Sequence, residues 1–169
     1  MCQAGRAVPS ARLSGSAGVA IPGEPQVLDW GLAMGVSLSN FAATKLTASA
    51  EGFVQARRFV REHLQRWNLQ YAADDVLSVM GELAANAVRH TSAPDDGAWL
   101  ALATGPRSVM CIVRDPSTQA PDPRSSGYLE AGGRGLGVVT VLSALWGWTA
   151  DAHGKAVWAR VPIRTGGLS

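Results

Sequence analysis

Two pairs of short apolar segments constrain the fold of this 169-residue chain more than any other feature. The two members of each pair are separated by only a few residues: residues 97–104 and 108–114 by Gly105-Pro106-Arg107, and residues 146–151 and 155–163 by a turn at His153-Gly154. Strands joined so closely pair antiparallel, because a parallel pair needs a crossover of about a dozen residues. The sequence therefore predicts a sheet built from antiparallel hairpins.

Two helices are predicted ahead of the first hairpin, after a weakly marked strand at residues 40–47. Behind the candidate N-cap Ser49, apolar side chains recur at helical spacing over residues 50–67, with arginines on the opposite face. A second helix runs from Asp74 to about Thr91. It is apolar around most of its circumference, which indicates that it is largely buried.

The predicted elements follow the order strand, two helices, hairpin, long loop, short helix at residues 136–145 and hairpin. Helices that cover one face of such a sheet make an α+β fold, here a two-layer α/β sandwich with a mixed, mostly antiparallel sheet and helices on one face. The loop, residues 115–133, is rich in proline and glycine. It exceeds the ~12–15 residues beyond which such a loop is usually functional.

Charge divides the chain into a leader and a body. The first 43 residues hold only four charged side chains, although the chain has 15 Lys and Arg and 13 Asp and Glu. We predict a flexible leader at residues 1–39, rich in Gly, Ala, Ser and Pro, one domain at residues 40–163 and a short tail at residues 164–169. Within the leader, residues 26–39 suit a docking segment and a disordered continuation equally.

Net charge and cysteine usage narrow the class of function. A net charge of +2 without a basic run disfavours general nucleic-acid binding. Two cysteines make no disulfide framework, and no apolar run approaches the ~20 residues of a membrane span. These features predict a cytoplasmic protein with no direct contact to nucleic acid or membrane.

The second helix carries a row of polar side chains spaced four residues apart: Ser78, Glu82, Asn86 and His90. The row either borders solvent or forms the floor of a ligand site, and the helix alone favours neither. In a ligand site, Asn86 offers an oxygen that suits Mg²⁺, and Glu82 can orient or deprotonate a hydroxyl or water. Arg89 can donate to a phosphate.

Two further features have both a structural and a functional interpretation. The run Gly132-Gly133-Arg134-Gly135-Leu136-Gly137 enters a helix, where free N–H groups suit a phosphate. It is neither a P-loop nor a dinucleotide fingerprint, and taken alone it is more simply explained as a glycine-rich turn without a ligand. Asp115, at the end of an apolar strand, either initiates the turn at Pro116 or accepts a hydrogen bond from a ligand's amino group.

In their order and spacing these motifs resemble the GHKL (Bergerat-fold) ATPase superfamily, which includes histidine kinases, gyrase-type ATPases and bacterial anti-sigma factor kinases. The resemblance covers about residues 40–163. Its motifs are Glu82-Leu83-x-x-Asn86-Ala87-x-Arg89-His90, Asp115-x-Ser117-x-x-x-Pro121 and Gly133-Arg134-Gly135-Leu136-Gly137. The closing Gly154-Lys155-x-Val157-Trp158-Ala159 is similar to the ending of the actinobacterial, anti-sigma-kinase-like branch.

The resemblance implies a role for each motif. Asn86 matches the asparagine that holds Mg²⁺ on the nucleotide phosphates, and Glu82 matches the candidate base for the substrate's serine. Asp115 matches the aspartate that recognises the adenine amino group, although Asp115-Pro116-Ser117 departs from the common Asp-x-Gly-x-Gly. The implied nucleotide-binding residues are Asn86, Arg89, His90, Asp115, Gly133, Arg134, Gly135, Leu136, Gly137 and Lys155.

The function implied is that of an ATP-binding regulatory protein with ATP and Mg²⁺ as cofactors. It would be an anti-sigma factor and serine/threonine kinase that phosphorylates a STAS-type antagonist and sequesters a sigma factor, and it would regulate transcription. The alternatives are a non-catalytic, ATP-gated protein-binding module and a degenerate, purely structural site. Arg57 and Arg58 would dock an acidic partner, although a solvated helix face explains them too; such kinases are commonly homodimers. A sensor kinase and a gyrase-like machine are not expected.

Overall fold

The computed structural model describes residues 38–89, 97–117, 119, 121, 135–151 and 154–164. Within these ranges five strands form one sheet in the order β1-β2-β3-β5-β4, and every neighbouring pair is antiparallel. The strands are β1 (Phe41–Leu46), β2 (Ala98–Gly105), β3 (Ser108–Asp115), β4 (Leu145–Asp151) and β5 (Gly154–Pro162). The helical elements are α2 (Ala50–Arg66), the 3₁₀ segment η1 (Gln70–Ala72), α3 (Ala73–Arg89) and α4 (Gly135–Leu142).

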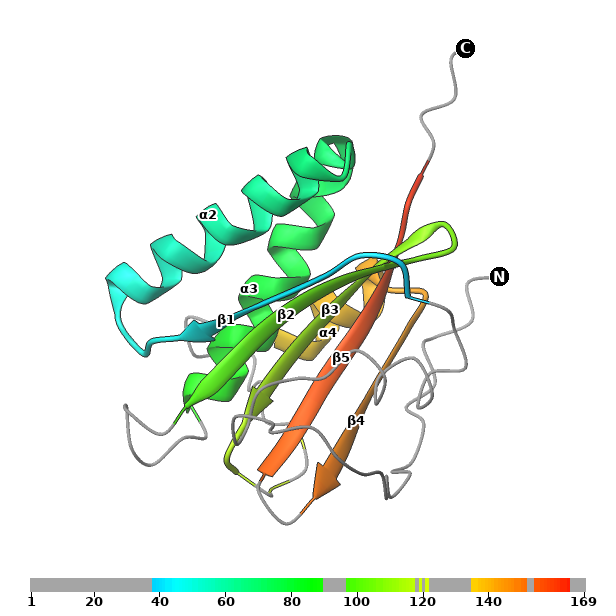
Figure 1. Cartoon of the computed structure of the whole chain (residues 1–169). Coiled ribbons are helices and arrows are strands. Elements are labelled where there is room, and N and C mark those ends of the chain that lie inside the picture. The colour runs from blue at the N-terminus through cyan, green and yellow to red at the C-terminus, as the bar shows by residue number, and fades with distance from the viewer. Residues whose placement is uncertain are drawn as a thin grey trace, which may run out of the picture.

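The three α-helices lie on the same face of the sheet and form the second layer of a sandwich (Figure 1). Leu64, Val79 and Leu83 from the helices are buried between the layers with Leu100 and Val113 from the strands. The helix α3 is central, since it contacts α2, α4 and β3. The predicted α+β two-layer sandwich is confirmed, and its sheet is antiparallel at every pairing of the described strands.

The opposite face of the sheet is apolar as well. Met110, Ile112 and Trp158 are buried there, and Leu38 and Phe41 pack against them. Apolar side chains on both faces explain why the central strands appear in the sequence as nearly continuous apolar runs. Strand-like segments were therefore easy to find, although their two faces could not be told apart from the sequence.

The cap at the start of α2 is confirmed. Ser49 has an extended backbone, and its Oγ accepts a hydrogen bond from the Gly52 N–H at 3.0 Å. Glu51 adds a carboxylate in the first turn, where the helix dipole favours negative charge. The buried residues Val60 and Leu64 lie on the face that meets the core, as the helical spacing predicted.

The third predicted helix is shorter than expected. It ends at Leu142, whereas the prediction extended it to residue 145. Ser143 N–H still donates to Val139 O at 2.9 Å, but Ala144 N–H donates to Arg160 O at 2.8 Å. The chain therefore joins the sheet immediately after the helix, and β4 begins at Leu145. Cross-strand pairing, which a helical pattern in the sequence does not reveal, sets this boundary.

Candidate functional site

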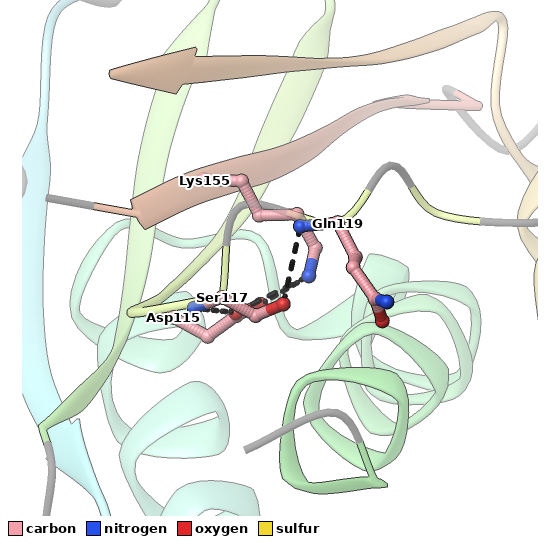
Figure 2. A network of polar contacts seen from close by, with 4 residues as sticks. All are labelled: Asp115, Ser117, Gln119 and Lys155. Atoms are coloured by element: carbon pink, nitrogen blue, oxygen red, sulfur yellow. Dashed lines mark hydrogen bonds and ion pairs between the residues drawn. The ribbon is translucent and has the colours of Figure 1, made fainter. Parts of the chain in front are cut away.

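A buried ion pair joins the ends of two neighbouring strands. Asp115 is the last residue of β3 and Lys155 is the second residue of β5, and the antiparallel register places them opposite each other. Lys155 Nζ lies 3.2 Å from Asp115 Oδ1 and 3.1 Å from Oδ2, and the two residues are 1% and 2% exposed. Figure 2 shows the pair with the polar contacts beside it.

The Asp115 carboxylate also organises the start of the loop that follows β3. Its Oδ1 accepts a hydrogen bond from the Ser117 N–H at 2.8 Å, and Ser117 Oγ accepts one from the Gln119 N–H at 3.2 Å (Figure 2). The first contact is a turn of the kind that aspartate favours, because the side chain accepts from the backbone two residues on. The predicted turn-initiating role is therefore present, and it uses only one of the two carboxylate oxygens.

Close backbone packing fixes this corner of the sheet. Gly154 has a φ of 142°, and a methyl group on its Cα would overlap the Asp115 carbonyl oxygen and lie 2.8 Å from Pro116 Cα. Glycine alone accepts both the conformation and the contact. The sequence offered a signal for this contact in Gly154-Lys155 directly after a turn, but it did not indicate that the lysine would pair with Asp115.

The predicted polar row follows one side of α3. Glu82 and Asn86 are half-buried, whereas Ser78 is exposed and donates from its Oγ to Asp74 O at 2.9 Å. Arg89, the last residue of the helix, is exposed and donates from Nε to Ala85 O at 3.4 Å. From Ser78 to Asn86 the row therefore passes from an exposed to a half-buried position.

The glycine motif is described only in part. Gly135 begins α4, Leu136 is buried, and Gly137 is exposed with open space where a Cβ would stand. Because α3 contacts both β3 and α4, one helix links the elements that carry Asn86, Asp115 and Gly137. The predicted site residues His90, Gly133 and Arg134 lie outside the described residues.

Buried polar atoms without a hydrogen bond point to the same residues. Over the described ranges three side-chain atoms are in this condition: Asn86 Nδ2, Asp115 Oδ2 and Ser143 Oγ. Asp115 Oδ2 faces Lys155 as half of the ion pair but accepts no hydrogen bond of good geometry. Such atoms are rare in folded proteins, and a bound water, ion or ligand is one explanation for them. Two of the three belong to the residues predicted to hold the two ends of a nucleotide.

The predicted partner-binding residues lie elsewhere. Arg57 and Arg58 are exposed on α2, and Arg57 borders a small, mostly apolar groove between α2 and α3. The remaining members of the groove are Phe53, Ala56, Val60, Leu77, Met80, Gly81, Ala84 and Leu100. Of the helices in the described ranges, none is long and apolar enough to cross a membrane.

Comparison with known proteins assigns the family. The model of the histidine kinase-like ATPase domain matches residues 46–161, more than half of the chain. The chain therefore belongs to the histidine kinase-like ATPase family, of the GHKL type, and ATP is the ligand that this family implies. No curated protein matches it at a significant level.

A solved structure supports the fold. The chain is similar to the RsbU and RsbW domains of Rv1364c from Mycobacterium tuberculosis, with a TM-score of 0.55 and 19% sequence identity. The similarity covers 75% of this chain and 34% of that one, so this chain spans about a third of its length. At this identity the likeness concerns the fold alone.

Proposed function

We propose that this chain binds ATP with Mg²⁺ and acts as a serine/threonine kinase of the anti-sigma factor type. The observation that carries the proposal is the pair of buried, unpartnered atoms, Asp115 Oδ2 and Asn86 Nδ2, on residues predicted to hold adenine and the phosphates. Family membership and the likeness to a structure that contains an RsbW domain support it. The substrate would be a serine of a STAS-type antagonist, and the sequestered partner a sigma factor.

Asp115 accounts for a preference for adenine. An ionised carboxylate only accepts hydrogen bonds, and Oδ2 has capacity left after Oδ1 has bound Ser117 and Lys155. Adenine presents an amino group at position 6, which donates, whereas guanine presents a carbonyl oxygen there, which would face the carboxylate with like polarity. The buried end of β3 therefore suits ATP and disfavours GTP.

Asn86 and its neighbours account for binding of the phosphates. Mg²⁺ is commonly held by one or two protein oxygens together with substrate phosphates and waters, so the amide oxygen of Asn86 fits its donor chemistry. The unpartnered Nδ2 of the same amide is a hydrogen-bond donor and suits a phosphate oxygen. When bound, the ion would neutralise charge on the phosphates. Arg89, exposed at the end of α3, adds a cationic donor. Gly137 leaves space for a phosphate to approach the backbone of α4.

Glu82 is the proposed base. It is half-buried on α3, one turn before Asn86, so its carboxylate and the amide project from the same side of the helix. It would accept the proton of the substrate's serine hydroxyl while the serine oxygen bonds to the γ-phosphorus and ADP leaves. No hydrogen bond or ion pair occupies Glu82 within the described residues, so the carboxylate is available for this role.

Phosphate transfer to a panel of STAS-type antagonist domains tests the kinase. The wild-type chain with ATP and Mg²⁺ is expected to produce phosphoserine on one of them, and Glu82→Ala is expected to bind ATP normally while phosphorylation is lost. Ser78→Ala, four residues earlier on the same row and bonded only to Asp74 O, is the matched control and should remain active. Absence of phosphoserine with every domain would rule out the kinase.

The second candidate is an ATP-gated binding module without catalysis. It is favoured by the same freedom of Glu82, because no neighbouring group among the described residues orients the carboxylate for proton transfer. In that case Glu82→Ala would leave partner capture intact and Asn86→Ala would abolish its dependence on ATP. We further propose that residues 40–163 suffice for ATP binding in the cytoplasm, that Arg57 and Arg58 contact the partner, and that the protein is a homodimer.

A further inference from the structure

The buried ammonium of Lys155 is placed to act on Asp115. Lys155 is 1% exposed and belongs to the largest fully buried side chains of the described residues. Its Nζ contacts both oxygens of the Asp115 carboxylate, at 3.2 and 3.1 Å. We infer, on the basis of the proposed ATP binding, that Lys155 determines base specificity as a positioning residue: it holds Asp115 so that Oδ2 faces the base, and it does not itself contact the nucleotide.

Backbone geometry makes the position of Lys155 rigid. The register of β3 and β5 sets Lys155 opposite Asp115, and Ala150 of β4 pairs with Lys155 on its other side. The absence of a Cβ at Gly154 lets the start of β5 lie close to Asp115 and Pro116. These pairings fix the main chain of Lys155, and the burial of its side chain beside Asp115 restricts where the ammonium can move.

The contacts on the carboxylate leave hydrogen-bonding capacity on one oxygen, Oδ2, which lies 3.1 Å from Lys155 Nζ but accepts no hydrogen bond. Oδ1 accepts from the Ser117 N–H at 2.8 Å and from Lys155 Nζ, whereas Oδ2 accepts no hydrogen bond. Two contacts on one oxygen and a counter-charge along the edge of the group fix the rotation of the side chain about its Cβ–Cγ bond. Without Lys155, only the Ser117 N–H would hold the carboxylate, and either oxygen could turn toward the base.

A carboxylate oxygen held in one orientation can recognise a single hydrogen-bond donor on the base. Adenine has an amino donor at position 6, whereas the purine base of purine riboside triphosphate has only a hydrogen there. A site built to bond to that donor rejects the analogue lacking it. If Lys155 acts through Asp115, its removal lowers the discrimination between the two nucleotides. If Lys155 contacts a phosphate, its removal weakens the binding of both nucleotides equally.

The experiment measures binding of ATP and of purine riboside triphosphate to the full chain by calorimetry with Mg²⁺. Wild type is expected to prefer ATP, and Lys155→Met is expected to reduce the ratio of the two Kd values about ten-fold, mainly through weaker ATP binding. In an Asp115→Asn background, adding Lys155→Met should leave the ratio unchanged, because the group through which it acts is already altered. Thermal melts of all variants report folding.

The Asp115→Asn, Lys155→Met double variant also protects the test against unfolding. Lys155→Met alone leaves a buried carboxylate without its counter-charge, whereas the double variant leaves neither charge unpaired. If Lys155→Met does not fold, the double variant is compared with Asp115→Asn. Weaker binding of both nucleotides by the double variant would show that Lys155 contacts the nucleotide directly, and this would overturn the inference. Equal Kd values for each nucleotide in the double variant and in Asp115→Asn would support the inference.

Other outcomes separate this inference from the proposed function. Failure of wild type to bind ATP would contradict both the proposed function and the inference about Lys155. Binding of ATP by wild type, with a ratio unchanged in a folded Lys155→Met, would remove the inference alone and leave Lys155 as a structural partner of Asp115. Equal weakening of both nucleotides in folded Lys155→Met would show instead that the lysine binds the nucleotide directly.

Discussion

The two ends of the proposed ATP site are built in different ways. The adenine end lies inside the sheet and consists of Asp115, Ser117, Gly154 and Lys155. The phosphate end lies on helices and consists of Glu82, Asn86, Arg89 and Gly137. At the adenine end the polar groups bond to one another and the backbones touch. At the phosphate end, within the described residues, Glu82 and Asn86 are half-buried and Asn86 Nδ2 has no hydrogen bond, while the exposed Arg89 donates to its own helix.

This difference separates folding from binding. Changes at the adenine end disturb the junction of β3 and β5, so they are expected to lower stability. Changes at the phosphate end disturb groups that the fold does not use, so they are expected to lower affinity at little cost in stability. Three substitutions test this separation, and they are ordered from the largest expected effect to the smallest.

Gly154→Ala should be the most damaging to the fold. The new methyl group meets the Asp115 carbonyl oxygen and Pro116 Cα, and the φ of 142° is strained for any residue with a Cβ. We expect the free energy of unfolding to fall by about 3 kcal/mol or more, measured by urea denaturation. A loss of less than about 1 kcal/mol would show that the junction can open and that the adenine end is not rigid.

Gly97→Ala is the matched control. Gly97 also has a positive φ, 71°, but a Cβ there would meet nothing within 4 Å. It therefore carries the conformational cost without the overlap, and about 1 kcal/mol is expected. The difference between the two variants sets an upper limit on the cost of the overlap between β5 and the end of β3, because a φ of 142° is also less accessible to alanine than one of 71°. Equal losses would attribute the effect at Gly154 to backbone conformation alone.

Asn86→Ala should have the reverse pattern. Its Nδ2 is buried without a hydrogen bond, so removing the amide costs the fold no internal hydrogen bond through that atom. We expect the midpoint of thermal unfolding to change little, while ATP binding with Mg²⁺ weakens about 100-fold, as for the loss of a charge-assisted contact. Calorimetry and thermal melts on one preparation measure both quantities.

Ser78→Ala provides the comparison for Asn86→Ala. It removes a polar side chain from the same row of α3, but one that is exposed and bonded only to Asp74 O. Its ATP affinity should equal that of wild type. If Asn86→Ala loses stability and keeps its affinity for ATP, the phosphate end is a structural feature of α3 and the contrast between the two ends does not hold.

Much of the fold could be predicted from local patterns. The short turn at Gly105-Pro106-Arg107 forces an antiparallel pair, and the spacing of apolar residues in α2 selects a single face, so both elements were found nearly to the residue. The end of α4 was wrong because Ala144 bonds to Arg160, a strand partner that is distant in the sequence. Boundaries set by long-range pairing leave little trace in the local sequence.

The site was predictable to a different degree at each end. Glu82 and Asn86 stand out because polar side chains recur every four residues on an apolar helix. This pattern can be recognised from the helix sequence alone, without knowing what the side chains bind. The pairing of Asp115 with Lys155 depends on the register between strands β3 and β5, which are 40 residues apart at this point. The sequence signal for the pairing of Asp115 with Lys155 was limited to the position of each residue beside a glycine- or proline-rich turn.

Gly137→Ala should have the smallest effect, and a favourable one for the fold. Gly137 is helical and exposed, and a Cβ there meets nothing within 4 Å, so the packing of the described residues does not require glycine. Alanine should raise the free energy of unfolding by about 0.5–1 kcal/mol, because it reduces the entropy lost on folding. If the phosphates approach the backbone of α4 closely, the same methyl group should weaken ATP binding several-fold.

Gly81→Ala separates these two consequences. Gly81 is an exposed glycine inside α3, and a Cβ there also meets nothing within 4 Å, so a similar gain in stability is expected. Its ATP affinity should not change. More stable variants at both positions, with weaker ATP binding at Gly137 alone, would assign glycine at the start of α4 to the ligand. Unchanged affinity at both would restrict the phosphate end to the side chains of α3.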